Sequence, residues 1–169
     1  MIITDSETIA NFLEGSTQDY KGRTFSDIIS CSDSKMEECH DQVQWMFPLH
    51  EESKFAQTYP VLTRENIQKS QQSDKIKANL RMAAGRMEKF FAIGEHKDID
   101  KQRKWCRENN HNLLRITRII RCLRFFGLSA EAKDFHDKVV EAGNHFGISQ
   151  VTKAYWFRAM NEDVWKTLR

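Results

Sequence analysis

Seven polar side chains in two short segments of the sequence have the chemistry needed to grip a ligand. They are His40, Asp41, Gln44, Asn110, His111, Asn112 and Arg115. His40 and Gln44 are four residues apart and therefore share a face of any helix that contains both. An arginine holds a carboxylate through two parallel hydrogen bonds, so a pocket built from this set would suit a ligand carboxylate or amide. The alternative is a buried network between two helices, with Asn110 or Asn112 capping the second, because buried polar groups need partners in any case.

An aromatic cluster follows the first polar segment. Trp45, Phe47 and Pro48 come directly after Gln44, and aromatic residues of this kind line grooves that grip peptides. Large aromatic residues at a helix end also pack into cores, where they supply much of the buried area. The sequence leaves both interpretations open for Trp45.

Four arginines recur at three-residue intervals in the second segment, at Arg115, Arg118, Arg121 and Arg124. Such a stripe could contact the phosphates of a nucleic acid. The alternative is a solvated outer face, because the net charge is only +2 and the pI is near 8.3, far from the balance of a dedicated nucleic-acid binder. We therefore favour a peptide or protein partner over nucleic acid.

The motifs of known catalytic mechanisms are missing from the sequence. It contains no Gly-rich phosphate loop, no Gly-x-Ser-x-Gly and no His-Glu-x-x-His. Cys39, His40, Cys106 and His111 offer zinc-binding atoms, but their spacing matches no zinc pattern. We expect no enzyme activity, no catalytic residue, no metal and no cofactor. If the chain did catalyse a reaction, His40 and His111 would be the acid–base candidates.

The composition fits one folded domain over residues 1–169. The first residues lack the basic start and apolar core of a secretory signal, and no window is apolar enough to span a membrane. We therefore expect a cytoplasmic protein without membrane insertion, or a nuclear one in a eukaryote, with its four cysteines reduced. The sequence gives no indication of the oligomeric state.

The elements that would position these residues are helices, because no segment shows the period-2 alternation of a strand. Pro48 should end one helix, and Gly94, Gly127 and Gly147 should each end a longer helix with an apolar inward stripe. The expected helices cover residues 6–13, 24–29, 33–46, a short segment after 63, 73 to 94, 112–126, 129–146 and a last segment from 149. The sequence thus predicts an all-α fold, a compact bundle of about six or seven helices. An extended connector near residues 48–62 should pack through Phe55, Tyr59 and Leu62, and residues 95–101 should form a charged loop.

Two stretches are too long and unusual to be generic. HDQVQWMFPLHEES covers residues 40–53, and NNHNLLRITRIIRCLRFFGL covers residues 109–128. Together they resemble the conserved region of the opioid growth factor receptor family. Five shorter segments also match the family and occur in its order along the chain: FLEG, YKGRTFSDII, YPVLTRENI, RMEKFFAI and AYWFRA. The resemblance therefore extends over nearly the whole chain. The sequence departs from the family pattern at Val43, at Met46 and over residues 30–32, where a tryptophan is common.

The resemblance implies a helical domain, and the chain looks closest to short, stand-alone members of microbial type. For animal members, the family name implies binding of a short opioid peptide and a nuclear-associated receptor role. We predict a soluble binding module that recognises a peptide or protein through a groove between the Trp45 helix end and the Arg115 helix. The alternatives are nucleic-acid binding through the arginine stripe, and an enzyme that uses His40 and His111.

Overall fold

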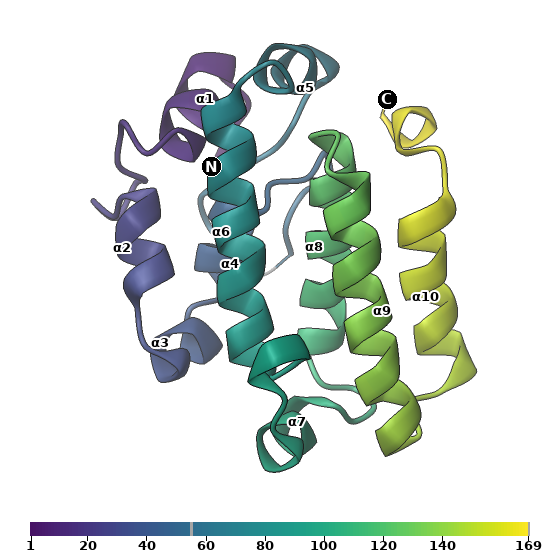
Figure 1. The fold of residues 1–169 in the computed structure, drawn as a ribbon. Coiled ribbons are helices and arrows are strands. Elements are labelled where there is room, and N and C mark those ends of the chain that lie inside the picture. The colour runs from purple at the N-terminus through teal and green to yellow at the C-terminus, as the bar shows by residue number, and fades with distance from the viewer. Residues whose placement is uncertain (55, 169) are drawn as a thin grey trace. The chain divides into compact units, whose positions relative to one another are not determined.

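A computed structural model describes residues 1–54 and 56–168. Over these residues the backbone forms ten α-helices, two short 3-10 helices and two strands of two residues each (Figure 1). The all-α fold predicted from the sequence is confirmed. The ten helices exceed the six or seven predicted for the bundle. Of the eight helical segments expected along the sequence, one is split in two, and one expected loop is largely helical. None of the described helices is both long and apolar enough to cross a membrane.

The chain divides into two compact units. Unit 1 comprises residues 1–83 together with the C-terminal residues from Lys166 onward, and unit 2 comprises Ala84–Trp165. The longest helix of the N-terminal half, α6 (Asp74–Phe91), contributes residues to both units.

Unit 1 is built from short helices with clear start signals. Besides the first part of α6, its elements are β1 (Ile2–Ile3), α1 (Ser6–Leu13), α2 (Phe25–Ser30), α3 (Asp33–Glu38), α4 (His40–Met46), β2 (Tyr59–Pro60) and α5 (Arg64–Ser70). Thr24 and Thr63 each close a capping box with the residue three positions later, so they start α2 and α5. The Asp5 side chain accepts a hydrogen bond from the Thr8 amide and starts α1. These caps fix where the helices begin, while helices this short are stabilised mainly by packing of their buried residues.

The segment expected to be one helix from 33 to 46 is two helices. Cys39 has φ −97° and ψ 90°, which is not helical, so α3 ends before it and α4 begins after it. Every residue from Asp41 to Leu49 is buried. An amphipathic continuation of α3 would have left one side of this segment exposed, whereas a separate, reoriented helix buries all of it. α4 ends two residues before Pro48, as the proline requires.

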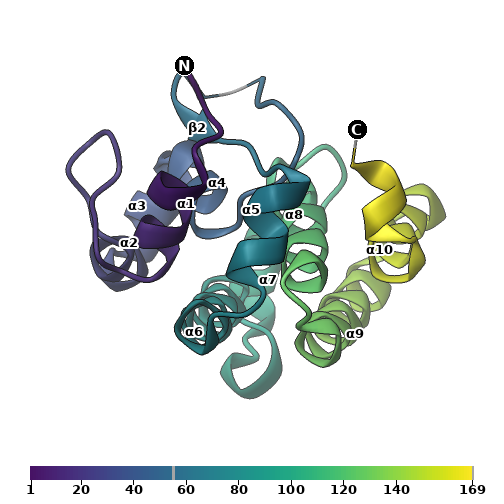
Figure 2. The same cartoon turned by 90° about the horizontal axis from the view of Figure 1, so that it is seen from above.

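The expected connector after Pro48 contains a short strand. β2 pairs in parallel with β1, with Ile2 opposite Tyr59 and Ile3 opposite Pro60, and Figure 2 shows β2 beside the N-terminal segment. Tyr59 and Leu62 are buried, as expected. Phe55 lies outside the described residues.

Unit 2 is dominated by three longer helices. After the end of α6 its elements are η1 (Gly94–His96), α7 (Ile99–Trp105), α8 (Asn112–Phe125), α9 (Ser129–Phe146), α10 (Gln150–Asn161) and the start of η2 (Val164–Thr167). α8, α9 and α10 pack pairwise against one another and lie side by side in Figures 1 and 2. The inward stripe of α8 is fully buried at Ile116, Ile119, Ile120 and Leu123.

Two expectations in unit 2 were wrong. Residues 95–101 are not a loop, because η1 and α7 occupy most of them and the Asp98 side chain caps α7 by accepting from the Lys101 amide. Gly94 does not end α6 directly. The helix ends at Phe91, and Ala92 takes the left-handed conformation with φ 53°. At the other end of the unit, Gly147 closes α9 in the left-handed conformation, as predicted.

Candidate functional site

The side chains predicted to bind a ligand are divided between the two units. His40, Asp41, Gln44 and Trp45 lie on α4 in unit 1. Asn110, His111, Asn112 and Arg115 lie at the start of α8 in unit 2. Each set has its own local geometry, and the binding role of the eight residues stays a prediction.

Asp41 is held by the loop that precedes α2. The Tyr20 hydroxyl donates to Asp41 Oδ2 at 2.9 Å, and Lys21 Nζ lies 2.8 Å from the same oxygen. Arg23 donates from Nη1 and Nη2 to both Asp41 oxygens at 3.3 and 3.1 Å. Arg23 is itself anchored, because its Nε donates to Asp19 Oδ2 at 2.7 Å. The carboxylate therefore already has three donors from its own unit.

These contacts control the charge of Asp41. Burial raises the pKa of its carboxyl group, but hydrogen bonds from Lys21, Arg23 and Tyr20 lower the pKa further than burial raises it, to below the ordinary 3.8. The group is thus a carboxylate at neutral pH, and it stabilises the fold by pairing with the loop. Sequence reasoning missed this loop as a partner of α4. The YKGR segment was noted for its family resemblance, but no local pattern connects it to a residue some twenty positions later.

Trp45 is a core residue of unit 1. Its side chain is 2% exposed, and its ring meets the Phe12 ring edge to face at a centroid distance of 4.9 Å. Gln44 beside it is also buried and donates from Nε2 to Ser53 Oγ. The Trp45 Nε1 and Gln44 Oε1 atoms are buried without a hydrogen-bond partner among the described residues. These two atoms, and not the indole face, are what this part of α4 could offer to a ligand or a water molecule.

His40 and Gln44 share their predicted spacing on α4 but not their environment. His40 is exposed at the first residue of the helix, whereas Gln44 is buried one turn later. The helix therefore passes from the surface into the core of unit 1 between the two residues.

The polar residues at the start of α8 form a short chain of hydrogen bonds. Asn110 Oδ1 accepts from the Asn112 amide at 2.9 Å, and Asn112 Oδ1 accepts from Arg115 Nη1 at 3.1 Å. Arg115 is 6% exposed, while His111 is exposed and makes no side-chain capping hydrogen bond. Asn110 thus satisfies one of the amides that the first turn of a helix leaves unpaired, as one of the two sequence interpretations expected.

Two arginines of the stripe join α8 to α10. Arg121 Nε lies 3.0 Å from Glu162 Oε1, and Arg124 Nη1 donates to the Ala159 carbonyl at 2.8 Å. Burial lowers the pKa of Arg124. Both side chains are half-buried, so the solvated outer face considered from the sequence is wrong for this part of the stripe. A nucleic acid would have to compete with these contacts for the two guanidinium groups.

The four cysteines are thiols. Cys106 and Cys122 are buried, and burial raises the pKa of the Cys106 thiol to about 12. Among the described residues, no group of three or more His, Cys, Asp or Glu side chains is arranged to hold a metal ion.

A different part of unit 2 presents apolar side chains to solvent. Leu114 on α8 is 66% exposed, and on α10 Val151 and Tyr155 are 67% and 55% exposed. Val151 and Tyr155 are one turn apart and share a face of α10. In the sequence both are simply apolar residues of the last helix, and no local signal indicates that they face outward.

α8 and α10 pack against each other, and Leu114, Val151 and Tyr155 are exposed apolar residues of this helix pair. Leu114 precedes Arg121 by two helical turns, so the two residues lie on the same side of α8. The Arg158 guanidinium stacks over the Tyr155 ring at 5.4 Å. We define the α8–α10 face by five residues: Leu114, Arg118, Val151, Tyr155 and Arg158.

Fold and surface together define an all-α protein whose polar signature residues are largely paired within each unit and whose second unit carries an exposed apolar and basic face. The chain belongs to the family of the opioid growth factor receptor (OGFr) conserved region, whose model matches residues 17–143. The resemblance seen in the two long motifs is thereby confirmed. The matched range excludes FLEG and AYWFRA, which lie on either side of it. Neither the curated proteins nor the solved structures contain a significant match to the chain.

Proposed function

We propose that this protein is a binding module that recognises a protein or peptide partner through the α8–α10 face. The observation that carries the proposal is the exposure of Leu114, Val151 and Tyr155 on two helices that pack against each other. Single exposed apolar residues are common on protein surfaces, but neighbouring ones form a patch whose burial against a partner is favourable. Tyrosine is also a frequent anchor residue in protein interfaces.

The charges around the face indicate what the partner carries. The α10 sequence from Gln150 to Asn161 contains no acidic residue, and its two charged side chains are Lys153 and Arg158. Arg118 adds a third positive charge from α8. A partner segment with apolar side chains flanked by carboxylates complements this surface, whereas a second copy of the same face would bring like charges together.

The matched family range covers only one of the two helices that form this face. α8 lies inside residues 17–143, and α10 lies outside them. Leu114 and Arg118 therefore belong to the region that defines the family, and Val151, Tyr155 and Arg158 belong to a part of the chain that the family model does not describe. A partner that contacts both helices would be specific to chains that share this α10.

Photo-cross-linking tests the proposal while the partner is still unidentified. A benzophenone amino acid is placed at Tyr155 in one variant and at Phe157 in another, and each is irradiated in a native cell extract. Phe157 is 62% exposed on the same helix but points about 200° away from Tyr155, so it is a matched control. We expect a protein adduct from position 155 that is absent from position 157.

Binding of the purified adduct partner then measures the contribution of the face. Leu114→Ser and Tyr155→Ser should each weaken binding by about tenfold or more, and Phe157→Ser should leave it unchanged. Circular dichroism confirms that each variant is folded. Identical adducts from both positions would contradict the proposal. Recovery of nucleic acid alone, with an affinity that falls as salt rises, would favour the arginine stripe instead.

A further inference from the structure

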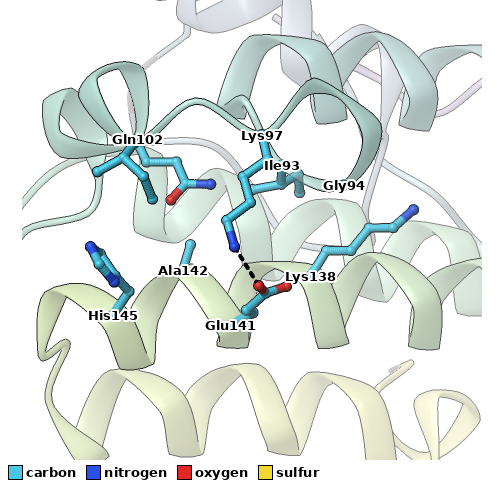
Figure 3. A pocket seen from close by; sticks show the side chains of 9 residues that line it. Ile93, Gly94, Lys97, Gln102, Lys138, Glu141, Ala142 and His145 are labelled. Atoms are coloured by element: carbon cyan, nitrogen blue, oxygen red, sulfur yellow. Dashed lines mark hydrogen bonds and ion pairs between the residues drawn. The ribbon is translucent and has the colours of Figure 1, made fainter.

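Unit 2 has a pocket of about 130 Å³, whose walls come from residues 93–102 and residues 138–145 (Figure 3). Its lysines and its glutamate are already paired. Lys97 Nζ lies 2.7 Å from Glu141 Oε1, and Lys138 is held by two carboxylates. The charges around the pocket thus satisfy one another, whereas the α8–α10 face exposes apolar and basic side chains to solvent. The pocket therefore leaves less for a partner to satisfy than the α8–α10 face does.

α10 has one side toward α9 and an opposite side that is exposed. Lys153 Nζ donates to Asn144 Oδ1 of α9 at 2.9 Å, so α9 lies on the side of α10 that carries Lys153. Val151 and Tyr155 each lie about 160° around α10 from that residue. α9 therefore covers one side of α10, and the apolar side chains of the α8–α10 face project from the other.

The first turn of α8 lies level with the middle of α10. Trp156 Nε1 donates to the Leu113 carbonyl at 3.2 Å, which joins these two turns. Leu114 follows Leu113 and is 66% exposed, and Tyr155 precedes Trp156 and is 55% exposed. The exposed apolar residues of the two helices therefore lie at the same end of the helix pair.

The exposed side of α10 repeats with the period of a helix. Tyr155 and Arg158 follow Val151 by four and seven residues, so all three share one side of α10 over about two turns. Two apolar side chains are thus followed by a cation, whose guanidinium group contacts the Tyr155 ring. A surface with this period matches the side-chain ridges of another helix.

The backbone of both helices is already hydrogen-bonded internally. α8 and α10 are regular α-helices over Asn112–Phe125 and Gln150–Asn161, so the N–H and C=O groups of their middle turns bond to one another. An extended peptide on this face would find no backbone groups to pair with, and burial of its own unpaired groups is costly. A helix satisfies its own backbone and needs only side-chain contacts.

We propose that the partner segment that binds the α8–α10 face is an amphipathic α-helix. This inference rests on the proposed function and adds the conformation of the partner. The partner helix lies along α10, with apolar side chains at every third or fourth position against Leu114, Val151 and Tyr155. It places a carboxylate opposite Arg158, because α10 contains no acidic residue that would repel one.

Cross-linking from three positions measures the conformation of the partner segment. The benzophenone amino acid is placed at Val151, Tyr155 or Arg158, and mass spectrometry identifies the attachment points on the captured partner. Val151 and Arg158 are about 10.5 Å apart along α10, at about 1.5 Å per residue. Their attachment points should therefore lie about seven residues apart on a helix. An extended segment advances about 3.3 Å per residue, which would place them about three residues apart. The Tyr155 point should fall about four residues from the Val151 point on a helix.

A proline substitution gives a second, independent readout. The captured segment is synthesised as a peptide with either proline or alanine at one position between its attachment points. Proline breaks a helix but is tolerated in an extended segment, whereas alanine favours a helix. The proline peptide should bind at least about tenfold more weakly than the alanine peptide.

The charge contact is tested on the protein. Arg158→Glu should weaken binding of the captured peptide by about tenfold, and exchange of the facing acidic residue of the peptide for lysine should restore it. Lys153→Glu makes the same change on the side toward α9 and should leave binding unchanged. Circular dichroism confirms that both variants are folded.

The outcomes separate this inference from the proposed function. Attachment points about three residues apart, or equal binding of the proline and alanine peptides, would overturn the helical conformation and leave the face itself as the binding site. The absence of an adduct from all three positions would overturn both.

Discussion

The two units use similar residue types for different purposes. In unit 1 the signature aromatic Trp45 is packed on Phe12, and the signature carboxylate Asp41 is paired with the loop before α2. In unit 2 Tyr155 is exposed, and its ring contacts the guanidinium group of Arg158. Val151, one turn away on the same helix, is exposed as well. Two residues of unit 1 that were predicted to bind a ligand thus also stabilise its fold, whereas unit 2 exposes apolar residues that the sequence did not single out. Burial, more than residue type, separates the two roles.

The largest expected effect comes from exchanging an aromatic residue in each unit. Trp45→Ala should lower the free energy of unfolding by about 3–5 kcal/mol, because it leaves a large cavity in a packed core. Tyr155→Ala should change it by no more than about 0.5 kcal/mol, because the side chain is already exposed. Urea denaturation of both variants measures the difference. Equal losses would contradict the division of roles between the units.

A smaller and pH-dependent effect is expected at Asp41. Asp41→Asn removes the ion pairs with Lys21 and Arg23 and should cost about 2–3 kcal/mol at neutral pH. The pKa of Asp41 lies below 3.8 in the folded protein, so its stabilising effect is full above the unfolded pKa and is lost as the pH falls through the folded pKa. The difference in the free energy of unfolding between wild type and Asp41→Asn should therefore be constant at about pH 5–7. It should shrink as the pH falls below about 4.

Urea denaturation across this pH range makes the comparison, with Glu52→Gln as an exposed control that should show no such closing gap. A gap that persists or widens at acidic pH would mean that Asp41 is not the charged partner of the loop.

The smallest effect concerns the ion pair between α8 and α10. A double-mutant cycle on Arg121 and Glu162, whose side chains are 18% and 20% exposed, should give a coupling of about 0.5–1 kcal/mol. The same cycle on Lys69 and Glu65 in unit 1, which are 64% and 68% exposed, should give about 0.3 kcal/mol or less. A coupling of zero at Arg121 would mean that its ion pair with Glu162 adds nothing measurable to the packing of α10 against α8.

Local sequence signals predicted the helix boundaries well where a cap or a breaker was present. Thr24, Thr63 and Ser149 each cap the helix that they were expected to start, and Pro48 and Gly147 end theirs. These signals act within a few residues of the chain and can therefore be seen in the sequence alone.

Features set by distant parts of the chain were not predicted. The helix break at Cys39 is not marked by a proline or glycine in the sequence. It follows from the burial of all of α4, which depends on distant residues. The partners of Asp41 come from a loop about twenty residues away, and the outward side of Tyr155 depends on which side of α10 packs against α8.

Hydrogen exchange of the protein with its cross-linked partner, once purified, decides which unit recognises that partner. We predict slower exchange in peptides that cover residues 112–118 and 150–158 on adding the partner, and no change in the peptide that covers residues 40–46. Protection confined to residues 40–46 would mean that the signature residues of unit 1 bind the partner. It would contradict the assignment of binding to the α8–α10 face.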